Sequence, residues 1–186
     1  TGKNLTFDGS AGTATTLTCT GDFNATTGIG SVTIAKTSST GTSFTLASGC
    51  TLAANLTNSQ AAVTVDSTAS LTATGNWVST AVTNNGTITV NGTTWSNTNT
   101  FTNSGTFTAN NLTSFTSSGL TNNTTLDLST STVFDINGSL LNNVGGVIIY
   151  GGTSFSVVNW TQNGTFDITG KNLTFDGSAG TATTLT

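Results

Sequence analysis

The sequence predicts an all-β fold, a parallel β-solenoid in which short strands wind into stacked, three-sided coils. Thr, Ser, Asn and Gly dominate the chain, charged residues make up 5%, and there is no Pro, so strand and turn formers prevail. Apolar residues alternate with Thr in short segments such as GTITV at 86–90, the period of a half-buried strand. Related segments return after about 18 to 22 residues, an interval typical of solenoid coils.

The expected strands are copies of one phrase, in which two apolar residues flank a Thr or another residue that points outward. The copies are TTLTC (15–19), GSVTI (30–34), SGCTL (48–52), AAVTV (61–65), GTITV (86–90), GTFTA (105–109), TTLDL (124–128), GVIIY (146–150) and GTFDI (164–168). The last five start at positions 86, 105, 124, 146 and 164, which are nearly evenly spaced. The region 30–85 is less regular, which indicates an inserted loop or a misassigned coil.

Further apolar pairs follow each phrase, and Asn-Gly, Ser-Gly or Gly-Gly separates them, which predicts three strands and three corners per coil. Stacked coils would share one core, and Asn side chains at the corners would form amide ladders. The expected core ladder consists of Ile88, Val90, Phe107, Leu126, Leu128, Phe166 and Ile168. We expect about 8–9 coils of about 19–21 residues in each 168-residue unit, or roughly 38–43 Å of axis.

The domain organisation follows from an internal repeat. The segments 1–18 and 169–186 have the same sequence, TGKNLTFDGSAGTATTLT. The segment 1–168 is therefore interpreted as one tandem repeat unit of a solenoid, and the segment 169–186 as the start of the next identical unit. An engineered overlap is the alternative. The expected partners are further copies of the repeat, in the same chain or in a polymer, and lateral neighbours in a fibre.

Composition argues against several function classes. Three Lys and no Arg, with a net charge of −4, cannot build a phosphate-binding surface, so no nucleic-acid partner is expected. No apolar run reaches the length of a membrane span, so no membrane insertion of this segment is expected. Without His or Glu, a catalytic triad or a transition-metal site lacks its usual residues. We expect no enzyme, and no catalytic, cofactor or metal site.

The Asp residues are the remaining candidates for acid–base chemistry or for binding calcium. Asp127 and Asp167 occupy equivalent outward positions about two coils apart, with Ile149 between them. That separation is too large for the two carboxylates to share one ion. Solvated carboxylates that oppose lateral aggregation are the favoured interpretation.

Two kinds of covalent modification are open from the sequence. Cys19 and Cys50 could form a disulfide across about thirty residues, or they could be two buried thiols. Asn-x-Ser/Thr sequons would be N-glycosylation sites in a secreted protein of a glycosylating organism. These sequons are at Asn4, Asn24, Asn55, Asn85, Asn91, Asn111, Asn122, Asn123, Asn137, Asn159, Asn163 and Asn172.

Two surfaces would support a binding module instead. An outward threonine ladder is expected at Thr87 and Thr89, Thr106 and Thr108, Thr16 and Thr18, with Thr33 and Thr64 as partial members, and such ladders resemble ice-binding faces. Asp127, Val147, Ile149 and Asp167 interrupt it. Trp77, Trp95 and Trp160 could stack on sugars if exposed, although burial is the favoured interpretation. An ice- or glycan-binding solenoid on a cell surface is therefore the alternative function.

The recurring GTITV-like phrases, joined by Asn-Gly and Ser-Gly, resemble the coils of large secreted bacterial surface proteins. These are the filamentous-haemagglutinin-type and autotransporter-type adhesins, which have parallel β-helix stalks. The resemblance covers nearly the whole chain and rests on style of sequence. It implies an extracellular, elongated stalk or fibre. The perfect repeat of the opening segment favours a structural unit of a filament, sheath or adhesin stalk that assembles by end-to-end stacking of coils.

Overall fold

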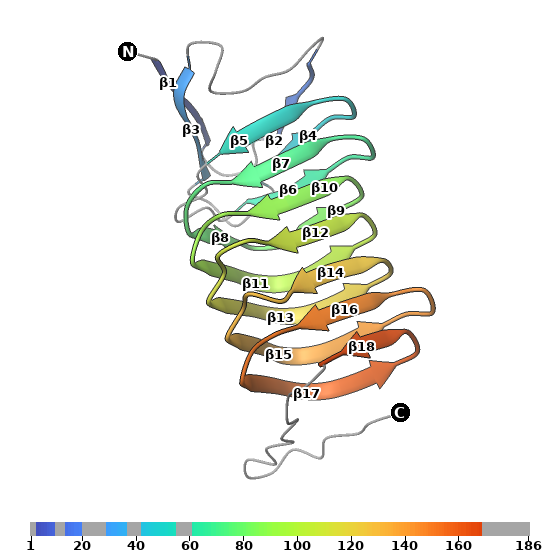
Figure 1. Ribbon diagram of the computed structural model, residues 1–186. Helices are drawn as coiled ribbons and strands as arrows, with labels where there is room; N and C mark the ends of the chain where they lie inside the picture. Colours follow the sequence, from blue (N-terminus) through green and yellow to red (C-terminus); the bar gives the residue numbers. More distant parts are fainter. Residues whose placement is uncertain (1–2, 10–13, 20–28, 37–41, 55–60, 169–186) are drawn as a thin grey trace.

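The computed structural model describes residues 3–9, 14–19, 29–36, 42–54 and 61–168, and in these residues the fold is a parallel β-solenoid (Figure 1). All strand pairs of this part are parallel, and each strand pairs with the corresponding strands of the coils before and after it. The fold class predicted from the sequence is confirmed. In the part of the chain that the structure describes, no helix is long and apolar enough to cross a membrane.

One side of the solenoid is a seven-stranded sheet in which successive strands belong to successive coils. Its strands are β5 (Thr51–Ala54), β7 (Ser70–Ala73), β10 (Thr87–Val90), β12 (Thr106–Ala109), β14 (Thr125–Leu128), β16 (Val147–Tyr150) and β18 (Thr165–Asp167). Equivalent residues of successive coils lie directly beside one another. Ile88, for example, pairs with Leu71 on one side and with Phe107 on the other. Six turns of the chain therefore separate the first strand of this sheet from the last.

The rest of the coil forms a nine-stranded sheet and a smaller two-stranded sheet. The larger sheet contains β2 (Ala14–Leu17), β4 (Ser43–Leu46), β6 (Ala62–Val65), β8 (Trp77–Ser79), β9 (Val82–Asn84), β11 (Thr94–Asn103), β13 (Ser114–Asn122), β15 (Val133–Asn142) and β17 (Ser154–Gln162). The smaller sheet pairs β1 (Lys3–Gly9) with β3 (Ile29–Lys36) near the N-terminal end (Figure 1).

The three corners expected in every coil are not all present. In β11 the second and third segments of the coil run together as one long strand, with a register shift between Asn97 and Thr100. The first segment of β11 pairs with β8 and the second with β9, so two separate strands of one coil merge in the next. A strand that keeps its backbone pairing on both sides of a bulge can turn without a loop, which is why no Gly-rich corner is needed there.

The irregular spacing over the region 30–85 came from assigning phrases to the wrong side of the coil. The segments 15–19 and 61–65 contain β2 and β6, which belong to the nine-stranded sheet, while 30–34 lies in β3. In the seven-stranded sheet, the strand that pairs with GTITV from the coil before it is SLTA at 70–73. The strand near position 50 begins at Thr51, whereas the sequence phrase was placed at 48–52. All sides alternate apolar residues with Thr, so the phrase alone does not identify the side.

The core is one continuous apolar column inside the coils. Ile88, Val90, Phe107, Leu126 and Leu128 are all 0% exposed. Phe166 and Ile168 are half-buried, because they belong to the last coil that the structure describes. The column advances from Leu52 to Phe166 in six steps, an average of 19 positions per step. The total of 8–9 coils and the second unit at 169–186 include residues outside the described part, and they stay predictions.

Candidate functional site

The described residues contain no cluster with the composition of a metal site. Within residues 3–9, 14–19, 29–36, 42–54 and 61–168, no group of three or more His, Cys, Asp or Glu side chains comes together. Asp127 and Asp167 lie on either side of Ile149 in the seven-stranded sheet, so their strands are two rungs apart. Asp127 accepts a hydrogen bond from the Ser129 amide at 2.9 Å, which is a local turn contact. The two outward carboxylates do not form a shared site.

A buried ladder of side-chain amides runs along one edge of the nine-stranded sheet. Asn84, Asn103, Asn122 and Asn142 are each 0% exposed, and Gln162 follows them. The Nδ2 of each Asn donates to the side-chain oxygen of the next member, at 2.8, 2.9, 2.9 and 3.3 Å. The sequence predicted amide ladders at corners, and this one points into the core, where an unpaired amide is costly.

The second proton of each ladder amide goes to a backbone carbonyl on the neighbouring side of the coil. Asn84 donates to Thr106 at 3.0 Å and Asn103 donates to Thr125 at 2.9 Å. The ladder therefore joins the two large sheets as well as successive coils. Its first member is different, because the Oδ1 of Asn84 is buried without a hydrogen-bond partner. The residue before it in the column is Val65, which has no donor to offer.

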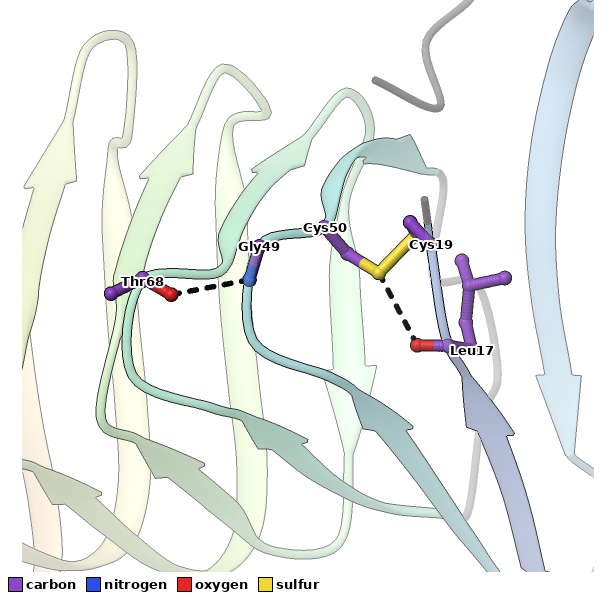
Figure 2. Close-up of a disulfide and its surroundings, with 5 residues drawn as sticks. All are labelled: Leu17, Cys19, Gly49, Cys50 and Thr68. Atoms are coloured by element: carbon purple, nitrogen blue, oxygen red, sulfur yellow. Dashed lines mark hydrogen bonds between the residues drawn. A yellow bond between two sulfur atoms is a disulfide. The ribbon is translucent and has the colours of Figure 1, made fainter. Parts of the chain in front are cut away.

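The disulfide lies at the N-terminal end of the solenoid (Figure 2). Cys19 follows β2 and Cys50 precedes β5, and their Sγ atoms are bonded with the Cα atoms 5.2 Å apart. The Sγ of Cys50 also lies 3.4 Å from the carbonyl oxygen of Leu17. Beside it, the amide of Gly49 donates to the hydroxyl of Thr68 in the next coil at 3.2 Å. The disulfide thus ties the end of one coil to the corner of the following one.

The corner beside the disulfide has a left-handed backbone in two successive coils. Gly49 has a φ of 79° and Thr68, which is stacked on it, has a φ of 64°. A Gly adopts this conformation without strain, whereas a β-branched Thr does so at a cost.

The sequons differ in whether they can accept a glycan. Asn122 is 0% exposed, and its Nδ2 donates to Oδ1 of Asn142 and to the backbone carbonyls of Thr124 and Val147, so this Asn is enclosed in the described fold. Asn123 is half-buried. The exposed sequon residues are Asn4, Asn85, Asn91, Asn111, Asn137, Asn159 and Asn163. Asn24, Asn55 and Asn172 lie outside the described residues.

The threonine surface differs from the expected one. The seven-stranded sheet carries Thr72, Thr89 and Thr108 in one outward column, which then continues into Asp127, Ile149 and Asp167. Thr16 and Thr64 are not members of this column, because they lie on the other sheet, and Thr33 pairs with Thr6 in the two-stranded sheet.

A longer threonine column on the nine-stranded sheet was missed from the sequence. It holds Thr in six successive rungs and ends at Leu141. Its members are Thr16, Thr45, Thr64, Thr83, Thr102 and Thr121. The even spacing of the last five members along the chain was the signal that could have identified it.

The tryptophans are inside the solenoid. Trp77 and Trp95 are 0% exposed and stack with ring centroids 4.5 Å apart, and Trp160 is 4% exposed. Trp95 also packs against Phe115, so the rings form part of the core column. The favoured interpretation, burial of the three tryptophans, is confirmed, and none of the three rings presents a face on which a sugar could stack.

The two ends of the solenoid share a property that its interior lacks. The apolar side chains that pack against the core but remain half-buried are nearly all in the first or last coils. They are Leu5, Phe7, Leu17 and Cys19 at one end and Phe155, Val157, Phe166 and Ile168 at the other, with Ala47 in addition. The residues one rung inward, such as Phe134, Ile148 and Ile34, are 0% exposed. Within the described residues, the core is therefore less completely covered at both ends than in its interior.

Comparison with known proteins places the chain in no family. None of the family models, curated proteins or solved structures compared with the chain matches it. The parallel β-solenoid fold therefore rests on the structure itself.

Proposed function

We propose that the chain is a structural repeat unit of an extracellular filament, sheath or adhesin stalk, which assembles by continuous end-to-end stacking of β-coils. The observation that carries the proposal is the half-burial of the outermost core residues at both ends of the described part. Solenoids that act as single units close their ends with polar caps, because an open end exposes apolar side chains and unpaired strand edges. Further coils of the same kind would cover both.

The contacts within the unit suit an extended mechanical element. Successive coils are joined by parallel backbone pairing on every side, and the amide ladder adds side-chain bonds in the same direction. Among the described strands, pairing runs between successive coils, which makes the stack quasi-one-dimensional. Length can then be changed by adding coils without any change in the local structure.

The disulfide supports an extracellular location. Disulfides persist in oxidising compartments and are rare where thiols are kept reduced. Cys19 and Cys50 are the two cysteines of the chain, and both are used in this bond. The exposed sequons are compatible with glycosylation outside the cell. We further propose that the chain comes from a surface protein of the filamentous-haemagglutinin or autotransporter type. This part of the proposal rests on the resemblance of its repeated GTITV-like phrases to the coils of those proteins.

Imaging of the native material by cryo-electron microscopy tests the proposal. We expect uninterrupted fibres with layers ~4.8 Å apart and an axial repeat of roughly 38–43 Å per 168-residue unit. Discrete particles with capped ends would contradict fibre building.

The six-rung threonine column favours ice binding as a second candidate function. Thr45, Thr64, Thr83 and Thr102 are half-buried on a regular sheet, so their methyl and hydroxyl groups repeat at the coil spacing. Thermal hysteresis of the isolated unit tests this function. Thr83→Lys would abolish the hysteresis, whereas Thr72→Lys on the seven-stranded sheet is the matched control. An isolated unit that shows no hysteresis would remove this candidate.

A further inference from the structure

We propose that successive repeats join in one fixed register, with β1 of the following copy lying on β17 so that Leu5 faces Phe155 and Phe7 faces Val157. The inference rests on the proposed function and specifies its joint. The occupant of the open C-terminal end is then the first coil of another repeat, whose opening sequence is that of segment 1–18.

The C-terminal face is an incomplete rung of the core. Phe155 and Val157 pair with Phe134 and Ile136 of the coil before them. Those two partners are 0% exposed, whereas Phe155 and Val157 are half-buried. Among the described strands, β17 is the last of its sheet, so one of its edges has no described strand beside it. A further coil would bury the second side of both residues, as β17 itself does for the coil before it.

The N-terminal face has the complementary pattern. In β1, Leu5 and Phe7 are half-buried and pack on the core, while Asn4 and Thr6 are exposed. β1 pairs with β3 on one edge, where Phe7 lies opposite Ile34, which is 0% exposed. β1 and β17 therefore each present two half-buried apolar residues that alternate with polar ones.

Spacing along the chain agrees with this match. The segment 169–186 repeats the segment 1–18, so the sequence counterpart of Leu5 is Leu173, and the step from position 155 to position 173 is 18. In the same column, the steps from Trp77 to Trp95, to Phe115, to Phe134 and to Phe155 are 18, 20, 19 and 21. The step across the proposed joint lies within this range.

Other registers pair the wrong residues. A shift of two positions in one direction places Gly9 against Val157, which leaves that side chain without a partner. A shift in the other direction places Lys3 against Phe155 and takes a charge into the core, at a large cost. A shift of one position turns every apolar side chain of β1 to the outside. The register with Leu5 on Phe155 buries all four apolar side chains.

The disulfide holds this docking coil to the rest of its own unit. Cys19 follows β2 directly, and its bond to Cys50 fixes the end of β2 against the corner before β5. Leu17 and Gln162 belong to one column of the nine-stranded sheet, so if that column continues across the joint, Leu17 of the following copy faces Gln162, where the amide ladder ends. Each unit then contains its own complete ladder, which begins after Val65 and stops at the joint.

Engineered disulfides in the full 186-residue chain test the register. Thr174 is the counterpart of Thr6, which the proposed register places opposite Ser156. Ser156→Cys with Thr174→Cys should therefore form a disulfide, since neighbouring strands lie ~4.8 Å apart and a disulfide spans about 4.4–6.8 Å between Cα atoms. The matched control is Ser156→Cys with Asn172→Cys, which is two positions out of register, about 8 Å away by the same strand geometry.

Ser156 is exposed, and Thr174 and Asn172 are the counterparts of Thr6 and Asn4, which are exposed in β1. Peptide mapping by mass spectrometry in a glutathione buffer distinguishes the new bond from the bond between Cys19 and Cys50. We expect the 156–174 bond to form at least tenfold faster than the 156–172 bond. Equal rates, a faster control or no bond in either variant would overturn the register, provided that circular dichroism shows a folded β protein. Native material without fibres would reject the proposed function while a selective 156–174 bond would still support the joint.

Discussion

The buried amide ladder gives a sharp prediction because its first two members have similar contacts and different consequences. Asn84 and Asn103 each donate to the next Asn and to a backbone carbonyl on the neighbouring side. Val65 precedes Asn84 in the same column, so Val is a residue that this column already accommodates. We compare Asn84→Val with Asn103→Val, which are adjacent in the structure and identical in chemistry.

The difference between the two variants lies in the buried donors and acceptors that each leaves without a partner. In the native chain there is one such acceptor among the described ladder residues, Oδ1 of Asn84. Asn84→Val removes that unpaired acceptor but takes the donor away from Oδ1 of Asn103, so the number of unpaired acceptors stays at one. Asn103→Val keeps the unpaired Oδ1 of Asn84, deprives Oδ1 of Asn122 of its donor, and deprives one Nδ2 proton of Asn84 of its acceptor. Each unpaired buried group costs about 1–3 kcal/mol, and Asn103→Val leaves one more acceptor and one more donor unpaired than Asn84→Val, so Asn103→Val should be the more destabilising by at least that amount.

Urea unfolding followed by the fluorescence of the buried tryptophans measures this difference. Because the m-value depends on the surface exposed, and both variants expose the same surface, the difference appears as a lower midpoint for Asn103→Val. The wild type and both variants should have the same slope. Equal midpoints for the two variants, or a lower midpoint for Asn84→Val, would refute the argument that the ladder is limited by its unpaired end.

Three further predictions concern packing, the disulfide and pH. Gly105→Ala should cost about 1–3 kcal/mol, because its new Cβ would lie 2.0 Å from a backbone oxygen of the coil before it. Gly119→Ala should be tolerated, because its nearest neighbour would be the Thr100 hydroxyl at 3.3 Å and the next, the backbone oxygen of Ser139, lies at 3.7 Å; thermal melting compares the two variants. Reduction of the Cys19–Cys50 disulfide, whose sequence separation is 31, should lower stability by about 3–4 kcal/mol, and a double Cys→Ser variant that still responds to reductant would contradict this assignment. Burial raises the pKa of Tyr150 above its ordinary value of 10.0, so the neutral phenol is favoured in the fold, and stability present below pH 10.0 should be lost as pH rises through the folded pKa. Tyr150→Phe should remove this alkaline loss in urea titrations across the alkaline range, and an unchanged pH profile would show that Tyr150 is not its source.

Tyr150 also shows why a single position in the column can be special. Its hydroxyl donates to the carbonyl of Thr132 at 2.9 Å and accepts from the amide of Ser154 at 3.1 Å. It replaces an aliphatic residue in the rung after Leu128, and its ring contacts Phe134 and Phe155. The sequence places Tyr150 in a strand phrase, but the two backbone partners of its hydroxyl come from other segments of the coil.

The sequence was sufficient for the fold class because the alternation of apolar and polar residues is local. GTITV, GTFTA and TTLDL present the same face in the same order, and the structure stacks Ile88, Phe107 and Leu126 in line. A strand of this kind buries one side, and equal spacing between copies brings the buried sides together. The prediction was strongest from position 86 onward, where the copies are evenly spaced.

The side of the coil to which a strand belongs was not a local property. The segment at 61–65 has the same alternation as the segment at 86–90, yet Val63 pairs with Phe44 and Val82 in the other sheet. For one strand alone, the backbone hydrogen bonds and apolar contacts would be equally favourable in either of the two large sheets. The choice depends on the lengths of the connections before and after it, and therefore on the whole stack.

The sequence by itself determined that the chain alternates, repeats and lacks the residues of most catalytic sites, since these are properties of order and composition. The tertiary structure decided which polar residues face inward. Asn122 and Asn123 are adjacent and both begin sequons, but Asn122 is 0% exposed in the amide ladder, while Asn123 is half-buried and bonds to Ser104. A buried amide needs hydrogen-bond partners, and the ladder partners of Asn122 are Asn103 and Asn142 in the coils before and after it, 19 and 20 positions away along the chain.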